Sequence, residues 1–172
     1  MWCYGSYQTA YDEMLKTVKP KIEFFKGVPD DLSECINPSQ NNVLIIDDLM
    51  AKAGDDKSVT DLFTKGSHHM NLSIIYIVQN IFPKGRERRT IRINAHYMFV
   101  FKNPRDPSQI NSLGRQLYPT HPRCLGEAYQ NATKEPHTYL MVDLKQQTPE
   151  ALWLCMGILP KDESYVYVPK HV

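Results

Sequence analysis

The sequence has no strong excess of charge and no long apolar run. Its 172 residues carry 20 Lys and Arg against 19 Asp and Glu, so any binding to nucleic acid must come from a local basic patch. No apolar stretch is as long as the segment of about 20 residues that crosses a bilayer as a helix. The first residues also lack the basic-then-apolar layout of a signal peptide. We therefore expect one intracellular globular domain that has no membrane partner.

Disulfide, metal and common catalytic patterns are also missing. The four cysteines are widely scattered, as Cys3, Cys35, Cys124 and Cys155. Without a CxxC pair they favour reduced thiols over a disulfide framework. His121 and Cys124 have zinc-like spacing but no second pair nearby. His68 and His69 would project about 100° apart on a helix and could not easily chelate one metal. No GxSxG and no GxGxxG is present, which weighs against a hydrolase or a dehydrogenase.

Apolar runs alternate with helical patterns along the chain. Strands are predicted at residues 1–5, 21–25, 41–49, 71–80, 95–103, 138–144 and 151–159. Helices are predicted at residues 7–18, 58–69, 106–118 and 122–133, with a helical turn or two at 30–36 and a basic loop or short helix at 82–92. The tail, 163–172, is an edge strand or a docking arm. Continuous apolarity indicates strands covered on both faces, so the order predicts an α/β fold with a mostly parallel sheet flanked by helices.

Polar side chains stand where three successive strands end. The stretch VLIIDDLM passes from four aliphatic residues into Asp47 and Asp48. Gln79 closes the next strand, and Lys102 and Asn103 close the one after it. Chemistry in parallel α/β sheets gathers at the carboxyl ends of the strands. We therefore expect these side chains at one edge of the sheet.

Four aliphatic residues before Asp-Asp form the Walker B pattern of nucleoside triphosphatases. In that interpretation Asp47 orients the water shell of a Mg²⁺ ion bound to nucleotide phosphates. Asp48 points to the other side of the strand and polarises the attacking water. The amide of Gln79 can bond both that water and the γ-phosphate. The alternative is a solvated strand end or a helix cap.

A basic cluster follows Gln79. Its members are Lys84, Arg86, Arg88 and Arg89. The cluster is a solvated loop, an arginine finger that reaches a neighbouring subunit's nucleotide, or a set of phosphate contacts to DNA. Arg105 is a second finger candidate, with an ion pair to Asp106 or packing at a helix end as the alternatives.

A phosphate cradle, G-x-x-x-x-G-K-[ST], is absent from the sequence. The segment AGDDKS lacks the glycine before Lys57 and follows Walker B instead of preceding it. It also places Asp55 and Asp56 where they would repel phosphate. A predicted strand at residue 1 has no preceding turn, so we expect a missing P-loop strand, loop and helix of roughly 30 residues or more, with Met1 an internal methionine.

The order of these motifs resembles one known family. The chain is similar to the poxvirus-type genome-packaging ATPases of the FtsK/HerA superfamily in three segments. In order, these are VLIIDDLM, LFTKGSHHMNLSIIYIVQNIFPKGRERRTIRINAHYMFVFKNPRD and LGRQLYP. The nearest resemblance is to the ATPases of Polinton/Maverick elements and related adenovirus-like viruses. It runs from MWCYG to about YLMVDL.

The resemblance implies a ring-forming motor that uses ATP and Mg²⁺ to pump double-stranded DNA into a capsid, at a virion assembly site inside the cell. Residues 1–172 would be one partial P-loop ATPase domain of the ASCE type, with its core at about 1–144 and C-terminal strands and tail at 145–172. Asp47 would be the Mg²⁺-linked acid, Asp48 the catalytic carboxylate and Gln79 the γ-phosphate sensor.

The resemblance also has departures. Relatives often carry Arg where this chain has Met70, which leaves Arg86, Arg88 and Arg89 as the finger candidates. The family places the P-loop strand between the strand ending at Gln79 and the strand ending at Phe101. Its absence would leave a gap there or force those two strands to pair, and each unpaired buried backbone group costs about 1–3 kcal/mol. The alternative function is an inactive remnant of a mobile element that binds DNA or protein at most.

Overall fold

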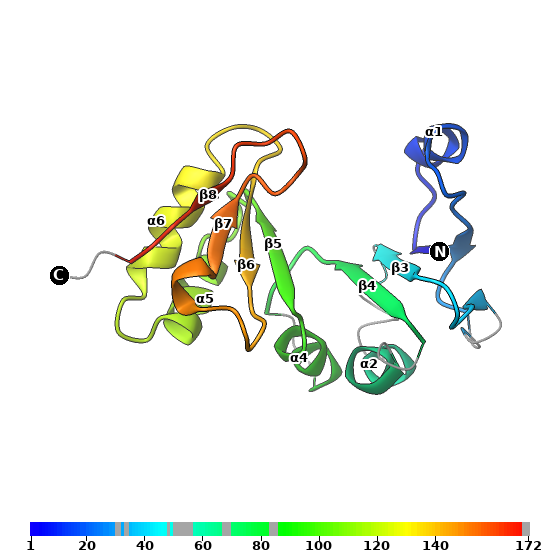
Figure 1. The fold of residues 1–172 in the computed structure, drawn as a ribbon, viewed down its shortest axis with the longest axis horizontal. Helices are drawn as coiled ribbons and strands as arrows, with labels where there is room; N and C mark the ends of the chain where they lie inside the picture. Colours follow the sequence, from blue (N-terminus) through cyan, green and yellow to red (C-terminus); the bar gives the residue numbers. More distant parts are fainter. Residues whose placement is uncertain are drawn as a thin grey trace. The chain divides into compact units, whose positions relative to one another are not determined.

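The computed structural model describes residues 1–29, 32, 35–47, 49, 57–66, 70–82 and 86–169. The chain divides into two compact units, residues 1–94 and 95–172 (Figure 1). Each unit has its own sheet and its own helices, as α/β chains require to bury one face of each element. The assignment of residues 1–172 to one partial ATPase domain stays a prediction.

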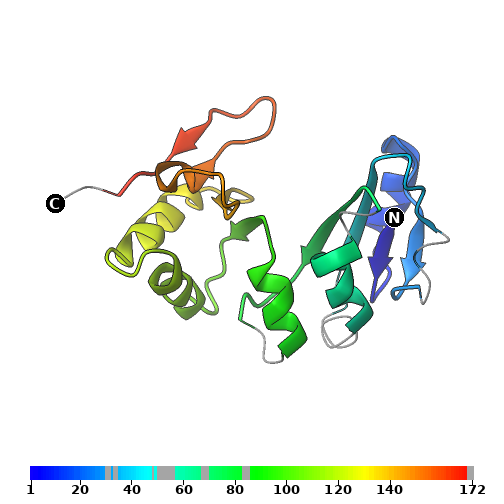
Figure 2. The ribbon, with the colours of Figure 1, turned by 60° about the horizontal axis from the view of Figure 1, so that its bottom comes forward.

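The first unit holds a parallel sheet of four strands in the order β2-β1-β3-β4. Its elements in chain order are β1 (Trp2–Tyr4), α1 (Ala10–Thr17), β2 (Phe24–Lys26), β3 (Asn42–Asp47), α2 (Lys57–Asp61), a π-helical turn η3 (Leu62–Gly66), β4 (Leu72–Ile77) and α4 (Arg86–Ile93). The predicted parallel α/β arrangement is therefore confirmed for this unit, whose helices can be followed in Figure 2. The predicted turn at 30–36 lies mostly outside the described residues.

One face of this parallel sheet forms the core of the first unit. Leu44 and Ile46 of β3 are fully buried there, together with Cys3 of β1. Val59 and Leu62, from α2 and η3, and Ile91 of α4 belong to the same cluster. Burial raises the pKa of the Cys3 thiol to about 11, so this cysteine acts as a small apolar residue. The alternation along β3 thus decides which side chains enter the core.

The opposite face of the sheet carries an aromatic cluster over β1 and β2. Tyr11 of α1 is 2% exposed and stacks on Phe24, with their ring centroids 4.9 Å apart. Trp2, Tyr4 and Tyr7 surround the same ring at 5.3–5.5 Å. Helix α1 covers only this half of the face. Over β3 and β4 the same face stays exposed, with Val43 46% and Ile75 50% accessible.

The second unit is built on an antiparallel sheet in the order β5-β6-β7-β8. Its elements are β5 (Tyr97–Phe101), α5 (Ser108–Leu117), α6 (Arg123–Ala132), β6 (Tyr139–Asp143), a 3₁₀ turn η4 (Glu150–Leu152), β7 (Leu154–Met156) and β8 (Tyr165–Val166). Helix α6 packs on β6 and β7, and α5 packs on α6. Among the described residues of the chain, no helix is long and apolar enough to cross a membrane.

Two sequence predictions are wrong in this unit. The strand at 95–103 was expected to continue the parallel sheet, but β5 pairs antiparallel with β6 in a separate sheet. Lys102 and Asn103 therefore do not share a sheet edge with Asp47. Apolarity predicts burial and says nothing about the direction of the partner strand. The segment 151–159 begins in the 3₁₀ turn, and only Leu154–Met156 is a strand.

Helices α5 and α6 approach closely at Gly114. A Cβ placed on Gly114 would lie 2.5 Å from the carbonyl oxygen of Pro122, which precedes α6. Gly126, within α6, has no atom near its own Cβ position within 4 Å. The first glycine therefore permits the contact between the two helices, while the second only weakens its helix.

We expect Gly114→Ala to destabilise the second unit by about 1–3 kcal/mol, because the added methyl group forces the backbone apart. Gly126→Ala is the matched control and should stabilise it by about 0.5–1 kcal/mol, since alanine favours the helix. Urea unfolding followed by circular dichroism measures both. Equal effects of the two substitutions would contradict the close approach at Gly114.

Candidate functional site

The carboxyl edge of the parallel sheet brings two predicted site residues onto neighbouring strands. Asp47 is the last residue of β3, and it aligns with Ile77, the last residue of β4. Gln79 follows Ile77 by two residues and is exposed. Paired strands lie about 4.8 Å apart, so a small ligand at this edge can reach both side chains. Asp48 lies outside the described residues.

Asp47 has a partner that the sequence did not indicate. The Tyr11 hydroxyl donates a hydrogen bond of 3.1 Å to Oδ2 of Asp47. Burial, together with this bond and the carboxylate charge, raises the pKa of Tyr11 to about 12. Tyr11 is not among the site residues predicted from the sequence. A buried tyrosine hydroxyl usually needs a hydrogen-bond partner, and this requirement is the signal that could have indicated Tyr11.

The bond from Tyr11 orders the Asp47 carboxylate. Asp47 is half-buried, on the same face of the sheet as Tyr4, with which it is in register. Its backbone carbonyl accepts the Gly5 N–H at 3.1 Å. With Oδ2 held by Tyr11, Oδ1 has no hydrogen-bond partner among the described residues and can face a water or a cation. The carboxylate is thus fixed at the sheet edge by α1 and β1.

Helix α4 carries the basic cluster. Arg86 and Arg89 lie three residues apart, hence on one side of the helix, and both are exposed. Arg88 belongs to the same helix, but its side chain lies outside the description, as does Lys84. No hydrogen bond or ion pair joins Arg86 or Arg89 to Asp47 within the described ranges. The segment predicted as a basic loop or short helix is therefore helical from Arg86 onward.

Arg92, on the same helix, was not among the predicted candidates. Its guanidinium lies over the Phe82 ring, 4.6 Å from the centroid. Partial burial, and then the positive charge of Arg89, lower the pKa of Arg92. A stacked arginine of this kind has less freedom to reach a ligand than the exposed Arg86 and Arg89. The contact fixes the last turn of α4 to Phe82.

Arg105 is exposed in the turn that follows β5. Its predicted alternative, an ion pair with Asp106, is not formed. The Asp106 carboxylate instead accepts Ser108 Oγ at 2.5 Å and Gln109 Nε2 at 2.9 Å. These bonds lower the pKa of Asp106, with the one from Ser108 the largest cause. Pro107 is the N-cap of α5, one residue later than expected.

The residues at the sheet edge fit one half of a nucleotide site. A strand-end carboxylate with one oxygen available suits a Mg²⁺ ion that is held through water, and a neighbouring amide suits a phosphate oxygen. The fit fails for the rest of the nucleotide, because no part of the sequence supplies a glycine-rich phosphate cradle. No three His, Cys, Asp or Glu side chains in the described part cluster as metal ligands.

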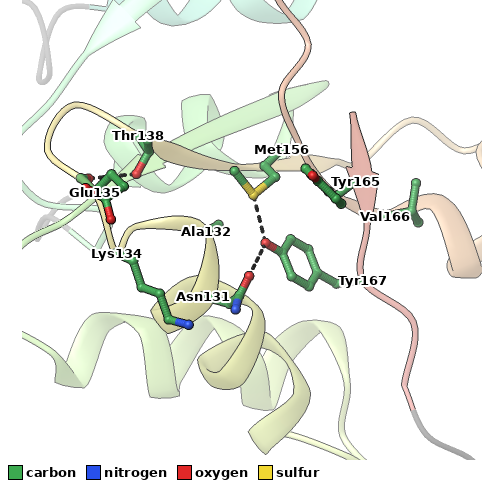
Figure 3. A pocket seen from close by; sticks show the side chains of 9 residues that line it. All are labelled: Asn131, Ala132, Lys134, Glu135, Thr138, Met156, Tyr165, Val166 and Tyr167. Atoms are coloured by element: carbon green, nitrogen blue, oxygen red, sulfur yellow. Dashed lines mark hydrogen bonds between the residues drawn. The ribbon is translucent and has the colours of Figure 1, made fainter. Parts of the chain in front are cut away.

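A hollow of about 390 Å³ lies in the second unit, between the end of α6 and the last strands. Figure 3 shows the Tyr167 hydroxyl inside it, within hydrogen-bond distance of two acceptors for its one proton, Asn131 Oδ1 and Met156 Sδ. Lys134 and Glu135 are its charged residues, one of each sign. The hollow holds none of the predicted site residues and offers no cluster of phosphate-binding groups.

Comparison with protein-family models, with curated proteins and with solved structures finds no match to this chain. The arguments about function therefore depend on the residues and on their geometry.

The bond between Tyr11 and Asp47 can be tested by titration. Asp47→Asn removes the negative charge beside the hydroxyl, so the pKa of Tyr11 should fall from about 12 toward its ordinary value of 10.0. Burial remains, and the fall should therefore be partial. ¹³Cζ resonances of tyrosine, with Tyr11→Phe to assign the signal among the 10 tyrosines, give the measurement.

Asp12→Asn is the control for that titration. Asp12 accepts a hydrogen bond of 2.7 Å from the Tyr7 hydroxyl. Its replacement should therefore change the pKa of Tyr7 and leave the pKa of Tyr11 unchanged. An unchanged pKa of Tyr11 in Asp47→Asn would show that the hydrogen bond does not form in solution.

Proposed function

We propose that this chain is part of an ATP-dependent DNA-packaging motor of the FtsK/HerA type. In this proposal the complete motor hydrolyses ATP, with Mg²⁺, to pump double-stranded viral or transposon DNA into a capsid. The observation that carries the proposal is the placement of Asp47 and Gln79 at the carboxyl ends of paired parallel strands. Its partners would be DNA, further copies in a ring, and capsid proteins, at a virion assembly site within the cell.

Each residue has a separate part in the proposal. Asp47, held by Tyr11, would orient water around Mg²⁺, which supplies charge neutralisation to the phosphates when bound. Asp48 would accept a proton from the attacking water, and Gln79 would bond the terminal phosphate. Arg86, Arg88 or Arg89 of α4 would act on a neighbouring subunit's nucleotide.

The outer edge of β4, which pairs with no other strand among the described residues, supports the proposal independently. Edge strands usually carry charges, proline or bulges that discourage further pairing, and β4 has none in the stretch LSIIYI. Both of its faces are apolar, and Ile75 and Ile77 are 50% and 44% exposed. This is the chemistry of a central strand in a parallel sheet. A parallel strand added at that edge would end beside Gln79, where a phosphate loop is required.

The missing cradle favours the second candidate, an inactive remnant that binds DNA or protein at most. The two candidates differ in what lies upstream of Met1 in the gene. An in-frame GxxxxGK[ST] supports the motor, whereas stop codons or unrelated sequence support the remnant.

The 172-residue chain should bind Mg-ATP weakly or not at all, because it lacks the loop that holds the phosphates. Isothermal titration calorimetry measures this directly. Micromolar affinity would contradict the expectation and would require a phosphate site elsewhere in the chain.

The same samples should unfold at low urea concentration, since a free apolar edge leaves the first unit marginally stable.

Where the upstream sequence encodes the phosphate loop, the extended chain tests the roles of the carboxylates. Asp48→Asn should lower kcat for ATP hydrolysis by roughly 10²–10⁴-fold while ATP still binds, because a catalytic base is lost. Asp12→Asn, at an exposed carboxylate in the same unit, should leave the rate unchanged. Full activity in Asp48→Asn would remove Asp48 from the mechanism.

A further inference from the structure

Helix α6 covers one face of the second unit's sheet, while the other face is exposed along β5 and buried at Met141 and Asp143 of β6. Val100, Leu140 and Leu154 point to the covered face and are buried. The open face presents the alternate residues of β5, because successive side chains of a strand point to opposite faces. These are Tyr97, Phe99 and Phe101, which are 43%, 47% and 54% exposed.

The three exposed rings of β5 form a row with a fourth ring beside it. Tyr139 of β6 is opposite Phe101 in the antiparallel register. Its ring centroid lies 5.5 Å from that of Phe99 and 5.8 Å from that of Phe101. Alternate residues along a strand are about 6.8 Å apart, so each ring of β5 can take a separate flat ligand. We call Tyr97, Phe99, Phe101 and Tyr139 the aromatic row.

Cationic side chains stand at both ends of the aromatic row. Lys145 Nζ lies 4.7 Å from the centroid of the Tyr97 ring. At the other end, Lys102 and Arg105 follow Phe101, and both are exposed. In the part of the chain that the structure describes, neither of these two side chains forms an ion pair.

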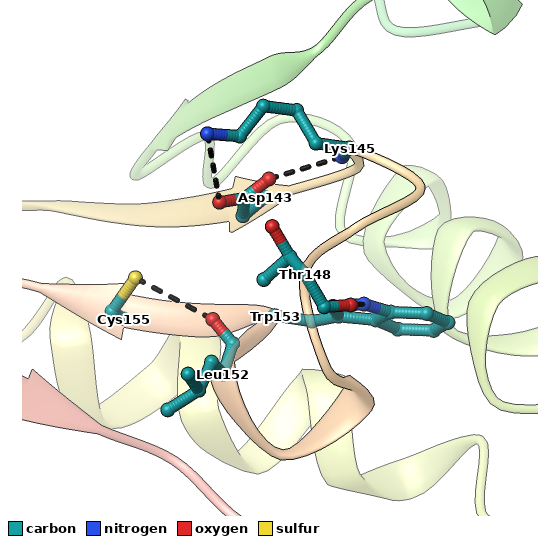
Figure 4. A network of polar contacts seen from close by, with 6 residues as sticks. All are labelled: Asp143, Lys145, Thr148, Leu152, Trp153 and Cys155. Atoms are coloured by element: carbon teal, nitrogen blue, oxygen red, sulfur yellow. Dashed lines mark hydrogen bonds and ion pairs between the residues drawn. The ribbon is translucent and has the colours of Figure 1, made fainter.

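The acidic side chains nearby are already engaged. Asp143 is 9% exposed, accepts the Lys145 backbone N–H at 3.0 Å and lies 3.9 Å from Lys145 Nζ (Figure 4). Asp106 is held by Ser108 and Gln109. Asp106 keeps its negative charge, since its partners are neutral, and Asp143 offsets Lys145. Lys102, Arg105 and Lys145 against these two carboxylates leave a net positive charge along the row, which suits a polyanion.

The open face of the first unit's sheet provides a contrast. Its exposed residues over β3 and β4 are aliphatic, among them Val43, Ile75 and Ile77. Aliphatic faces are covered by other protein segments, whereas aromatic rings between cations are the means by which proteins hold unpaired bases. Antiparallel four-stranded sheets with helices on one face stack bases on the other in this way.

We propose that the aromatic row binds single-stranded nucleic acid, with bases stacked on Phe99, Phe101 and Tyr97 and phosphates near Lys102, Arg105 and Lys145. This site is distinct from the proposed ATPase site, because it uses residues of the second unit alone. Stacking accepts any base, so the site prefers unpaired strands over duplex and has little sequence preference.

Fluorescence anisotropy of the full chain with a fluorescein-labelled oligothymidylate tests the proposal. A matched oligouridylate and a duplex of the same length are measured beside it. The single strands should bind more tightly than the duplex, and their affinity should fall as salt rises. Phe99→Ala and Phe101→Ala should each weaken binding by roughly 5- to 100-fold, the loss expected for one stacked base.

Two further variants separate base stacking from general apolar contact. Phe99→Leu keeps apolar area but removes the ring, so it should weaken binding nearly as much as Phe99→Ala. Phe99→Tyr keeps the ring and should bind as the unchanged chain does. Tyr165→Ala is the control, because Tyr165 is 50% exposed in the same unit but borders the hollow beside α6. Circular dichroism confirms that each variant is folded.

Several outcomes would overturn the proposal. They are the absence of binding at high micromolar protein, equal or tighter binding of the duplex, and full binding by Phe99→Leu. Light scattering supplies one more: concentration-dependent dimers that Phe99→Asp makes monomeric would show that the row is a protein interface. Binding of the duplex would fit the double-stranded DNA of the proposed motor, and the other results leave the ATPase proposal unchanged, since Asp47 and Gln79 belong to the first unit.

Discussion

The parallel pairing of β3 with β4 is the constraint on which the candidate site depends. The register that aligns Leu44 with Ile74 also aligns Asp47 with Ile77. The same pairing therefore buries the core side chains and places Asp47 at the sheet edge. A shift of one residue would turn the buried side chains of β3 to the open face. Because Leu44 and Ile46 are fully buried, their apolar area opposes such a shift, and the carboxylate stays at the strand end.

Helix α1 links this sheet edge to the aromatic cluster. Tyr11 contributes its ring to the packing over Phe24 and its hydroxyl to Asp47, so one side chain serves stability and the site together. A carboxylate held in this way loses less freedom when a ligand arrives, which is the general advantage of a preorganised site. Asp47 is consequently positioned by the fold even without a phosphate loop beside it.

The sequence predicted the elements of the first unit well, because continuous apolar runs and helical spacing are local signals. It predicted that the strands ending near Asp47 and Gln79 share one edge of a parallel sheet, and β3 and β4 do pair in parallel with Asp47 opposite Ile77. The predicted pairing of β5 was wrong. Its partner strand β6 lies about forty residues further along the chain, and the residues of a strand do not indicate the direction of its partner. The hydrogen bond from Tyr11 to Asp47 was not predicted either, because the two residues are 36 positions apart in the sequence.

The free edge of β4 has a consequence for the behaviour of the protein in solution. Among the described residues, β4 pairs with β3 alone, and its exposed Ile75 and Ile77 suit pairing with another extended apolar segment. A second copy offers such a segment, and β4 paired with β4 about a twofold axis closes as a dimer. Concentrated samples of this chain would then form dimers through β4, unless another segment occupies that edge first.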